Sequence, residues 1–580
     1  AIFTFEHTLL LDPAIATEAD RQGVFEVAAH EMAHQWFGDL VTMRWWDDIW
    51  LNEGFASWME GRTTAKLHPE WHTDLEDVAS REGAMARDAV ASTHPVVQHV
   101  ETVEQASQAF DAITYSKGAA VIRMLERYVG ADAWRTGVRH YMHDHAYGNT
   151  VSDDFWREVQ TAAGKPIIDI AHDFTLQPGV PLIRVDAATC AKGTTTLQLT
   201  QGEFTRDRPD KASLTWRVPV IAQVPGHEAA RTLVTGRKGT LAVPGCGAVV
   251  ANAGQSGYYH TLYAPALFET LRGQFAKLAT IDQLGVMADA WALGLAGLQP
   301  ASDYLSLVAA TPVQADPAVW GDIASSLQSL DAYYGGDTPE RRTFRQFAAS
   351  RLSPELARVG WNEQPGDSAP VRILRTQLID ALSTFDDPAV VAEARRRYAA
   401  QDSDPKAMPP ELRKTLLRVV ARHADAATWE QLHAAARKET TPLVKDELYG
   451  LLSSPEDAAL TQRALDLALT DEPGATNSAG MIARASRLHP DAAFDFAVAH
   501  RTQVDARVDS TSRSRYYPGL ANNSLDQGMI AKLKAFADSY IAATSRRATD
   551  TAIANIVYRR QVHDARLPAI DAWLKAQTKR

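Results

Sequence analysis

The stretch VFEVAAHEMAHQWFGDLVT, residues 24–42, contains two histidines four residues apart, with a glutamate directly after the first. In an α-helix, His30 and His34 would lie about 40° apart around the axis and about 6 Å apart along it. Two imidazoles in this arrangement can bind one cation, as the tetrahedral coordination of zinc requires. Glu31 would lie beside the pair, where a base for the reacting water belongs.

The same pattern has a second interpretation. Apolar side chains surround most of this helix, so we expect it to be largely buried, and a buried helix can hold histidines that only form hydrogen bonds. These apolar residues are Phe25, Ala28, Ala29, Met32, Ala33, Trp36 and Phe37. Because the H-E-x-x-H spacing also arises by chance, it does not decide between a metal site and a buried helix.

A third candidate ligand favours the metal site. Glu53 follows His34 after an interval of 18 residues, in WWDDIWLNEGFASWMEG, residues 45–61. This segment is predicted to be helical from about Leu51, with Phe55 on its apolar face. Two histidines and one glutamate leave the fourth position of a zinc ion open, which is typical of a catalytic zinc site. A structural site would use four protein ligands, commonly cysteines, and no cysteine lies nearby in the sequence.

The motifs in their order along the chain resemble the aminopeptidase N family of gluzincin zinc metallopeptidases. The central block HQWFGDLVTMRWWDDIWLNEGFA is highly specific, because the thermolysin branch of the gluzincins has a different sequence around its glutamate. Further similar blocks are FDAITYSKGAAVIRML (residues 110–125), QPGVPLIRV (177–185), TWRVPV (215–220) and GYYHTLY (257–263). The resemblance extends to about residue 330 and, more diffusely, over the helical remainder.

The resemblance implies a role for each residue that matches the family's motifs. It implies one zinc ion per chain, held by His30, His34 and Glu53. Glu31 matches the general base, which takes a proton from the attacking water and passes it to the leaving amine. Tyr115 matches the tyrosine whose hydroxyl stabilises the oxyanion of the tetrahedral intermediate. At residue 110, a phenylalanine stands where the family has an aromatic residue that lines the pocket for the first side chain.

The start of the chain departs from the family pattern. The sequence begins AIFTFEHTLLLDP, without the Gly-x-Met-Glu-Asn motif whose glutamate binds the substrate's α-amine in the family. Ile2, Phe3 and Phe5 indicate a strand that enters in the middle of a sheet. We therefore expect these 580 residues to be a fragment, with the missing N-terminal part of the same protein as a partner. In the family, the glutamate that matches Glu53 also helps to hold the amine.

Composition limits the class of protein and its partners. With 45% hydrophobic and 22% charged residues, the chain is typical of globular proteins, and its net charge of −12 disfavours a nucleic-acid partner. No apolar run is long enough to predict a membrane span in this segment. The two cysteines, Cys190 and Cys246, are either two buried free thiols or one disulfide. A disulfide would favour a periplasmic or secreted protein, and nothing else in the sequence indicates a compartment.

The sequence predicts a multidomain α+β protein with three parts. Residues 1–178 are mainly helical and match an incomplete thermolysin-like catalytic domain. Alternating strands such as TTTLQLTQGEF, separated by Gly, Pro and Asp turns, predict a small β-sandwich over residues 179–263. Alanine-rich amphipathic helices then follow over residues 264–580, which suggests an irregular α-solenoid without a fixed repeat period.

Together, these features predict a zinc aminopeptidase that releases N-terminal residues from peptides with a free N-terminus. Three alternatives stay open. A catalytically silent binding or scaffold relative would have lost ligands, whereas this chain keeps all of them. A bifunctional epoxide hydrolase of the same family has a shorter helical C-terminal domain. An endopeptidase shares the zinc chemistry and differs only in recognition of the amine.

Overall fold

The computed structural model describes residues 4, 6–208, 210–404 and 406–577. The strand predicted at Ile2, Phe3 and Phe5 lies outside the described residues. The chain forms two compact units. We call Phe25–Val319 the mixed unit, since it holds both helices and strands, and Ala1–Val24 with Trp320–Arg580 the helical unit.

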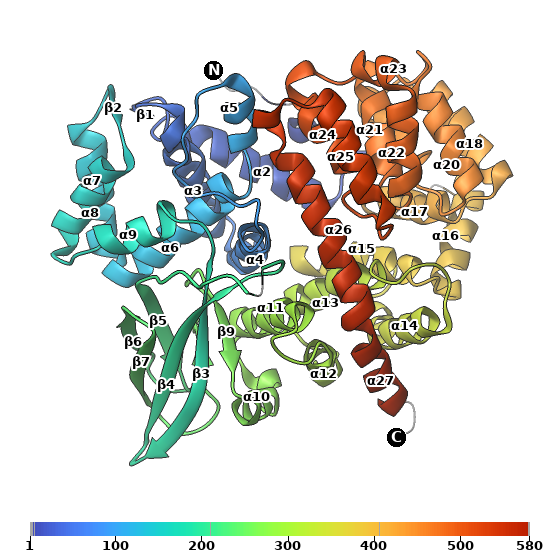
Figure 1. The fold of residues 1–580 in the computed structure, drawn as a ribbon. Helices are drawn as coiled ribbons and strands as arrows, with labels where there is room; N and C mark the ends of the chain where they lie inside the picture. The colour runs from blue at the N-terminus through green and yellow to red at the C-terminus, as the bar shows by residue number, and fades with distance from the viewer. Residues whose placement is uncertain (1–3, 5, 209, 405, 578–580) are drawn as a thin grey trace. The chain divides into compact units, whose positions relative to one another are not determined.

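The first part of the mixed unit is mainly helical, as the sequence predicts (Figure 1). Its helices are α2 (Glu18–Ala33, which begins in the helical unit), α3 (Trp50–Leu67), α4 (Glu76–Asp88), α5 (Val103–Ala109), α6 (Gly118–Val129), α7 (Ala131–Asp144), α8 (Ser152–Ala163) and α9 (Ile168–Thr175). Two short parallel strands, β1 (Val41–Met43) and β2 (Gly148–Thr150), pair beside them. The 3-10 helices of this part are η1 (Trp46–Asp48), η2 (Pro69–Trp71) and η3 (Thr73–Leu75). A π-helix, η4 (Ile113–Lys117), leads directly into α6.

Helix α2 is less buried than its apolar pattern predicts, so that expectation is wrong. Met32 is 58% exposed, and Trp36, in the turn that follows the helix, is 52% exposed. The apolar face of α2, opposite the two histidines, forms a cavity of about 450 Å³ with α3 and α7, lined by residues such as Phe25 and Met59. Amphipathic periodicity shows which side chains avoid water but does not specify an element that covers them.

The predicted strands form two small sheets (Figure 1). One has the order β7-β4-β3-β9 and the other the order β6-β5-β8. Their strands are β3 (Val180–Ala191), β4 (Thr194–Phe204), β5 (Val218–Gln223), β6 (Ala230–Val234), β7 (Lys238–Pro244), β8 (Val250–Ala251) and β9 (His260–Tyr263). Strand β4 coincides with the predicted TTTLQLTQGEF, and its buried Leu197 and Leu199 alternate with exposed residues. A disulfide joins Cys190 to Cys246, so the disulfide is the correct one of the two alternatives.

Helices continue to the end of the described chain. Those of the mixed unit are α10 (Pro265–Arg272), η5 (Phe275–Lys277), α11 (Thr280–Ala296) and α12 (Ser302–Ala310). Those of the helical unit are α1 (Glu6–Leu9), α13 (Pro317–Asp331, from Trp320 on), α14 (Pro339–Val359), α15 (Ala369–Thr384), α16 (Pro388–Ala400), α17 (Pro410–Arg422), α18 (Ala426–Lys438), α19 (Pro442–Leu451), α20 (Ala458–Ala468), α21 (Ala475–Ala485), α22 (Pro490–Ala499), α23 (Arg501–Asp505), η6 (Ser510–Ser512), α24 (Arg513–Leu520), α25 (Gly528–Tyr540), η7 (Ala543–Ser545), α26 (Arg547–Ala565) and α27 (Leu567–Gln577).

Local sequence signals fix where many of these helices begin. Asp387, Asp425 and Asp457 each accept backbone hydrogen bonds as the N-cap of α16, α18 and α20. Proline stands in the first turn of others, such as α14 and α17, where its missing N–H has no helical partner to lose.

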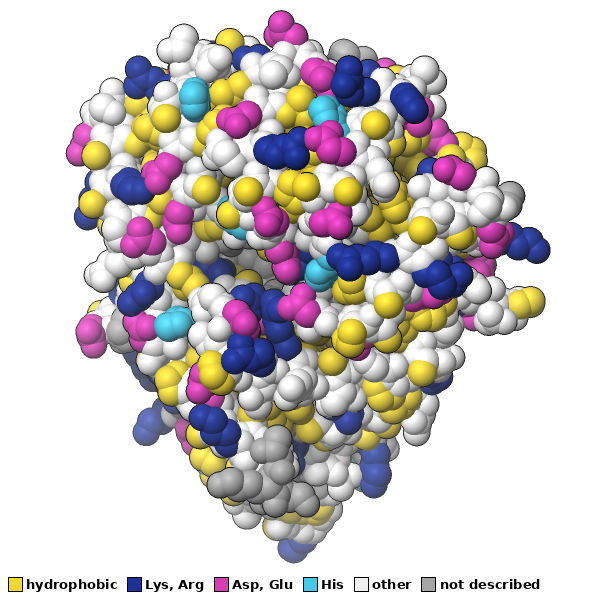
Figure 2. Space-filling model, turned by 90° about the vertical axis from the view of Figure 1, so that its right-hand side faces the viewer, with side chains coloured by type: hydrophobic (Ala, Val, Ile, Leu, Met, Phe, Trp, Pro, Cys, Tyr) yellow, Lys and Arg dark blue, Asp and Glu magenta, His cyan; other side chains and the backbone are white. Residues whose placement is uncertain are grey.

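On the face drawn in Figure 2, acidic and basic side chains are interspersed, as is typical of a solvated surface. Among the described helices, none has the length and apolarity that a bilayer span requires.

Candidate active site

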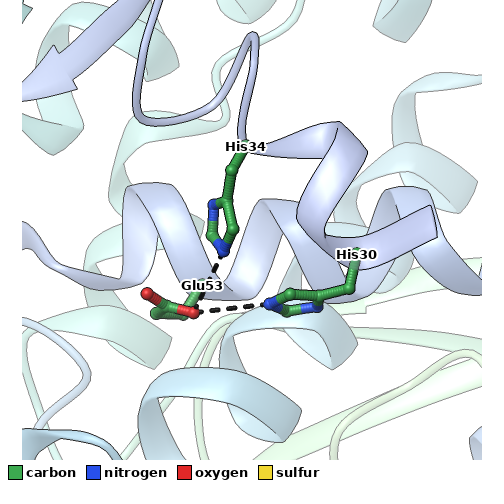
Figure 3. Close-up of side chains that lie close together, drawn as sticks. All are labelled: His30, His34 and Glu53. Atoms are coloured by element: carbon green, nitrogen blue, oxygen red, sulfur yellow. Dashed lines mark ion pairs between the residues drawn. The ribbon is translucent and has the colours of Figure 1, made fainter. Parts of the chain in front are cut away.

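The three predicted metal ligands meet in the mixed unit. His30 lies near the end of α2, His34 lies in the turn that follows the helix, and Glu53 lies in the first turn of α3. The Nε2 atoms of His30 and His34 are each 3.5 Å from the same Glu53 oxygen, Oε2 (Figure 3). The candidate ligand atoms lie within 4.8 Å of one another. The structure therefore brings the two histidines together with a glutamate from the next helix, α3.

The geometry of this cluster fits a zinc ion. Ligand atoms at about 2.1 Å from a tetrahedral zinc ion lie about 3.4 Å from one another. This is close to the 3.5 Å that separates each histidine Nε2 atom from Oε2 of Glu53. The other ring nitrogens are held by acceptors: Nδ1 of His30 is 3.0 Å from a Glu60 oxygen, and Nδ1 of His34 is 3.0 Å from the Phe37 carbonyl. These acceptors place the ring proton on Nδ1, so the Nε2 lone pairs are available to the metal.

The charges of the cluster favour a cation. Burial lowers the pKa of His30, but hydrogen bonds to Glu53 and Glu60 outweigh it and raise the pKa to about 9. Burial raises the pKa of Glu53, but hydrogen bonds from His30 and His34 outweigh it and lower the pKa to about 2. The carboxylates therefore stabilise positive charge at this position, which a divalent metal ion supplies more strongly than a proton.

A close contact between two glycines places Glu53 beside the tyrosine segment. A Cβ atom added to Gly54 would lie 3.2 Å from the Gly118 Cα atom and 3.2 Å from the Thr114 carbonyl oxygen. A Cβ atom added to Gly118 would lie 3.3 Å from the Gly54 Cα atom. The glycines of the NEG and SKG sequences thus allow α3 to approach η4 and α6 at backbone distance.

Tyr115 lies in the π-helix η4, next to the metal-ligand cluster. Its ring stacks on that of His30, with centroids 5.9 Å apart and planes inclined by 19°. Its hydroxyl faces the Glu53 carboxylate; burial and this carboxylate raise the pKa of the phenol above its ordinary value. The phenol therefore stays protonated near neutral pH and can donate a hydrogen bond.

Glu31 and Phe110 complete the predicted set. Glu31 is half-buried on α2, close enough to Tyr115 for its charge to raise the pKa of the phenol. Within the described part of the chain, its carboxylate has neither a hydrogen-bond nor an ion-pair partner. Phe110 is 41% exposed, and its ring centroid lies 6.4 Å from that of Tyr115 and 6.4 Å from that of Trp46.

Sequence reasoning missed Glu60, which holds the His30 ring. A signal for it was present: Glu60 lies seven residues after Glu53, two turns along the same face of α3, so both carboxylates can reach the imidazole of His30. The π-helix gave no comparable signal, because its sequence does not differ in pattern from that of an α-helix.

Comparison with known proteins identifies the family. Residues 1–174 match the peptidase family M1 domain, and residues 248–558 match the ERAP1-like C-terminal domain. The chain belongs to the aminopeptidase N family. Peptidases of this family are zinc-dependent in general, and His30, His34 and Glu53 form a candidate metal-binding group in this member.

Similar members of the family include proteins from fungi, plants and archaea. Aminopeptidase 2 of Candida albicans is 31% identical over 77% of this chain and 48% of its own length. Aminopeptidase M1-C of Oryza sativa subsp. japonica is 30% identical over 80% of this chain and 55% of its own length. The tricorn protease-interacting factor F2 of Thermoplasma acidophilum is 30% identical over 69% of this chain and 49% of its own length. The chain thus spans about half the length of these relatives.

Proposed function

We propose that this chain carries the catalytic site of a zinc-dependent aminopeptidase, which releases N-terminal amino acids from peptides with a free N-terminus. The observation that carries the proposal is the convergence of His30 and His34 on one Glu53 oxygen, with the Tyr115 hydroxyl beside it. These two histidines and Glu53 are the proposed ligands of one zinc ion per chain. The names of the relatives, which include several aminopeptidases, support peptidase chemistry.

The proposed mechanism divides the reaction among the residues of the site. Zinc, when bound, would supply a Lewis acid that polarises the carbonyl and makes water nucleophilic near neutral pH. Glu31 takes the proton of the attacking water and passes it to the leaving amine. The Glu31 carboxylate is half-buried and has no hydrogen-bond or ion-pair partner among the described residues. This supports the role, because a general base needs a free acceptor oxygen.

Tyr115 is the proposed oxyanion donor. Its protonated phenol, held against Glu53, would donate a hydrogen bond to the charge that develops on the carbonyl oxygen. The loss of one such donor raises the barrier by about 2.7–4 kcal/mol. Phe110, beside Tyr115 and half exposed, is proposed to line the pocket for the first side chain of the substrate.

We also infer the domain architecture of the chain from its membership of the aminopeptidase N family. Residues 1–178 would form the later part of a thermolysin-like domain, residues 179–263 a β-sandwich and residues 264–580 a solenoid. The contacts α15–α17, α17–α19 and α19–α21 support a stacked arrangement of helix pairs in the helical unit. The net charge of −12 supports a peptide rather than a nucleic acid as partner.

A comparison of two substrates tests the proposed function. The purified, zinc-loaded chain is incubated with a fluorogenic alanyl amide that has either a free or an acetylated α-amine. Cleavage of only the free form is expected. Cleavage of both forms would indicate an endopeptidase, and cleavage of neither with zinc still bound would count against peptidase activity of this chain by itself.

A further inference from the structure

A fully buried ion pair lies two residues from Tyr115. The Lys117 ammonium is 2.7 Å from Oδ2 of Asp88, and both side chains are completely inaccessible to solvent. Because burial removes the hydration of both charges, replacing such a pair by apolar residues of similar volume is often neutral or even stabilising. Stability alone therefore does not explain why this core position holds two charges.

Asp88, the last residue of α4, accepts hydrogen bonds from several segments of the chain in addition to its contact with the Lys117 ammonium. Its Oδ1 accepts hydrogen bonds from the Thr93 hydroxyl at 2.6 Å and from the Gly179 backbone N–H at 2.8 Å. Its Oδ2 accepts a hydrogen bond from the Tyr258 hydroxyl at 3.1 Å, in addition to the contact with Lys117. We call Asp88, Lys117 and Tyr258 the Asp88 cluster.

Tyr258 links the cluster to a second motif. It belongs to the GYYHTLY sequence, one of the blocks that resemble the family, and it lies in the core of the strand-containing part of the mixed unit. The Lys117 ammonium lies over the Tyr258 ring, 5.4 Å from its centroid, which adds a cation–π contact to the ion pair. The cluster therefore connects the strand-containing part directly to the segment that carries Tyr115.

That segment has an unusual backbone. Lys117 is the last residue of the π-helix, and its N–H donates to the carbonyl of Ala112, five residues earlier. Single π-turns are rare and occur often at functional sites. If the segment relaxed to the α-helical pattern, the register of Tyr115 relative to α6 would change by one residue, which rotates a side chain by about 100°.

The other end of the π-helix has its own anchor. Oδ1 of Asp111 accepts a hydrogen bond from the Ile113 N–H at 2.9 Å, and Oδ2 of Asp111 lies 2.9 Å from Nε2 of His94. Tyr115 therefore lies between two buried or half-buried polar anchors, of which the Asp88 cluster is the more enclosed.

We propose that the Asp88 cluster positions Tyr115, by holding the end of the π-helix in the register that directs the phenol hydroxyl at Glu53. This inference rests on the proposed function, in which that hydroxyl stabilises the oxyanion. Lys117 and Asp88 do not touch the substrate in this account and act only through Tyr115. The cluster is a group of positioning residues rather than catalytic residues.

A double-mutant cycle tests the proposal on the whole zinc-loaded chain. Lys117→Met, which removes the charge and keeps a long side chain, is measured alone and combined with Tyr115→Phe. Alone, it should lower kcat at least about tenfold and change KM by less than about twofold, because a donor used in the transition state is misplaced. In the Tyr115→Phe background it should lower kcat by no more than about twofold, since the donor is already gone.

Two further variants serve as an alternative and as a control in this test. Tyr258→Phe removes only one hydroxyl of the cluster and is measured in the same cycle, so the proposal stays testable if Lys117→Met fails to fold. Asp289→Asn is the matched control, because it disturbs the buried pair of Asp289 with His260 in the same unit, where the Oδ1–Nδ1 distance is 2.9 Å. The control should leave kcat unchanged.

Amide hydrogen exchange of residues 111–118 gives a readout that does not depend on turnover. Both cluster variants should accelerate exchange in this segment, whereas Asp289→Asn should not. Unchanged exchange, or an equal loss of kcat with and without the Tyr115 hydroxyl, would overturn the positioning role. If Tyr115→Phe alone keeps the full kcat, the proposed function of Tyr115 fails instead, and the exchange measurement still decides whether the cluster holds the segment.

Discussion

Among the residues that the structure describes, two groups of side chains bring histidine nitrogens and carboxylate oxygens close enough together to hold a metal ion. His30, His34 and Glu53 form the first group, in the mixed unit. The second group, in the helical unit, is formed by three residues at helix ends or in loops, Asp386, His423 and Glu456. In both groups, the candidate ligand atoms lie within 4.8 Å of one another, so distance alone does not separate them.

The two groups differ in whether their carboxylates are already paired with arginines. In the second group, Arg345 pairs with Asp386, and Arg422 lies 2.7 Å from a Glu456 oxygen, so each carboxylate is already neutralised. Nε2 of His423 is also engaged, 3.1 Å from both the hydroxyl and the carbonyl oxygen of Ser383.

In the first group, Glu53 and Glu60 form ion pairs only with histidines among the described residues. The pKa of His30 is accordingly raised to about 9 by these carboxylates, despite its burial. The pKa of His423 is lowered, mainly by burial. The comparison indicates that a metal site needs uncompensated carboxylates and free nitrogen lone pairs as well as the right spacing.

The largest expected effect comes from the base next to the first group. Glu31→Gln should lower kcat by about 10²–10⁴-fold, because the amide cannot take a proton from the attacking water. The bound zinc should stay, since Glu31 is not a ligand. Glu456→Gln in the second group is the control and should keep full turnover. Measurement of kcat and of zinc content checks both variants; full activity in Glu31→Gln would rule out the mechanism.

A smaller effect is expected from the residue that holds the His30 ring. Glu60→Ala should weaken zinc binding by about 10–100-fold, because the imidazole loses the acceptor that fixes its tautomer and orientation. Competition with a chelator measures the zinc affinity of this variant and of Glu456→Ala, which should bind zinc like the unchanged protein. Equal affinities in all three proteins would show that the two groups do not differ in the proposed way.

The smallest effect concerns the backbone contact that assembles the first group. Gly54→Ala should lower the free energy of unfolding by about 1–3 kcal/mol, because the new Cβ atom would press against Gly118. Gly61→Ala on the same helix is the matched control. Its Cβ atom would come no closer than 3.7 Å, to an Asp77 carboxylate oxygen. It should be neutral or stabilising by up to about 1 kcal/mol. Urea unfolding compares the two variants, and equal shifts would refute the role of the glycine contact.

Much of the first site could be predicted from sequence because its residues lie in local patterns. His30 and His34 are separated by about one helical turn, although α2 ends at Ala33, just before His34. Glu53 lies in a block specific enough to indicate the family. The strands of the small sheets were predictable for the same reason, since alternation along β4 is local.

Other features depend on contacts between distant segments, which a single sequence does not encode in any local pattern. Asp88, Lys117 and Tyr258 come from three segments, and no spacing connects them. The π-helix around Tyr115 was not predictable, because its register is set by its anchors rather than by periodicity. Helix α2 and the turn after it show the reverse failure. Their apolar residues were recognised correctly, but Met32 and Trp36 are exposed.

Zinc stoichiometry tests the central claim most directly. The protein, its His34→Ala variant and its His423→Ala variant are each equilibrated with zinc, passed through a desalting column and analysed for metal by mass spectrometry. We predict one zinc ion per chain in the unchanged protein and in His423→Ala, and none in His34→Ala. Zinc retained at full stoichiometry in His34→Ala, or lost in His423→Ala, would contradict the assignment of the first group as the metal site.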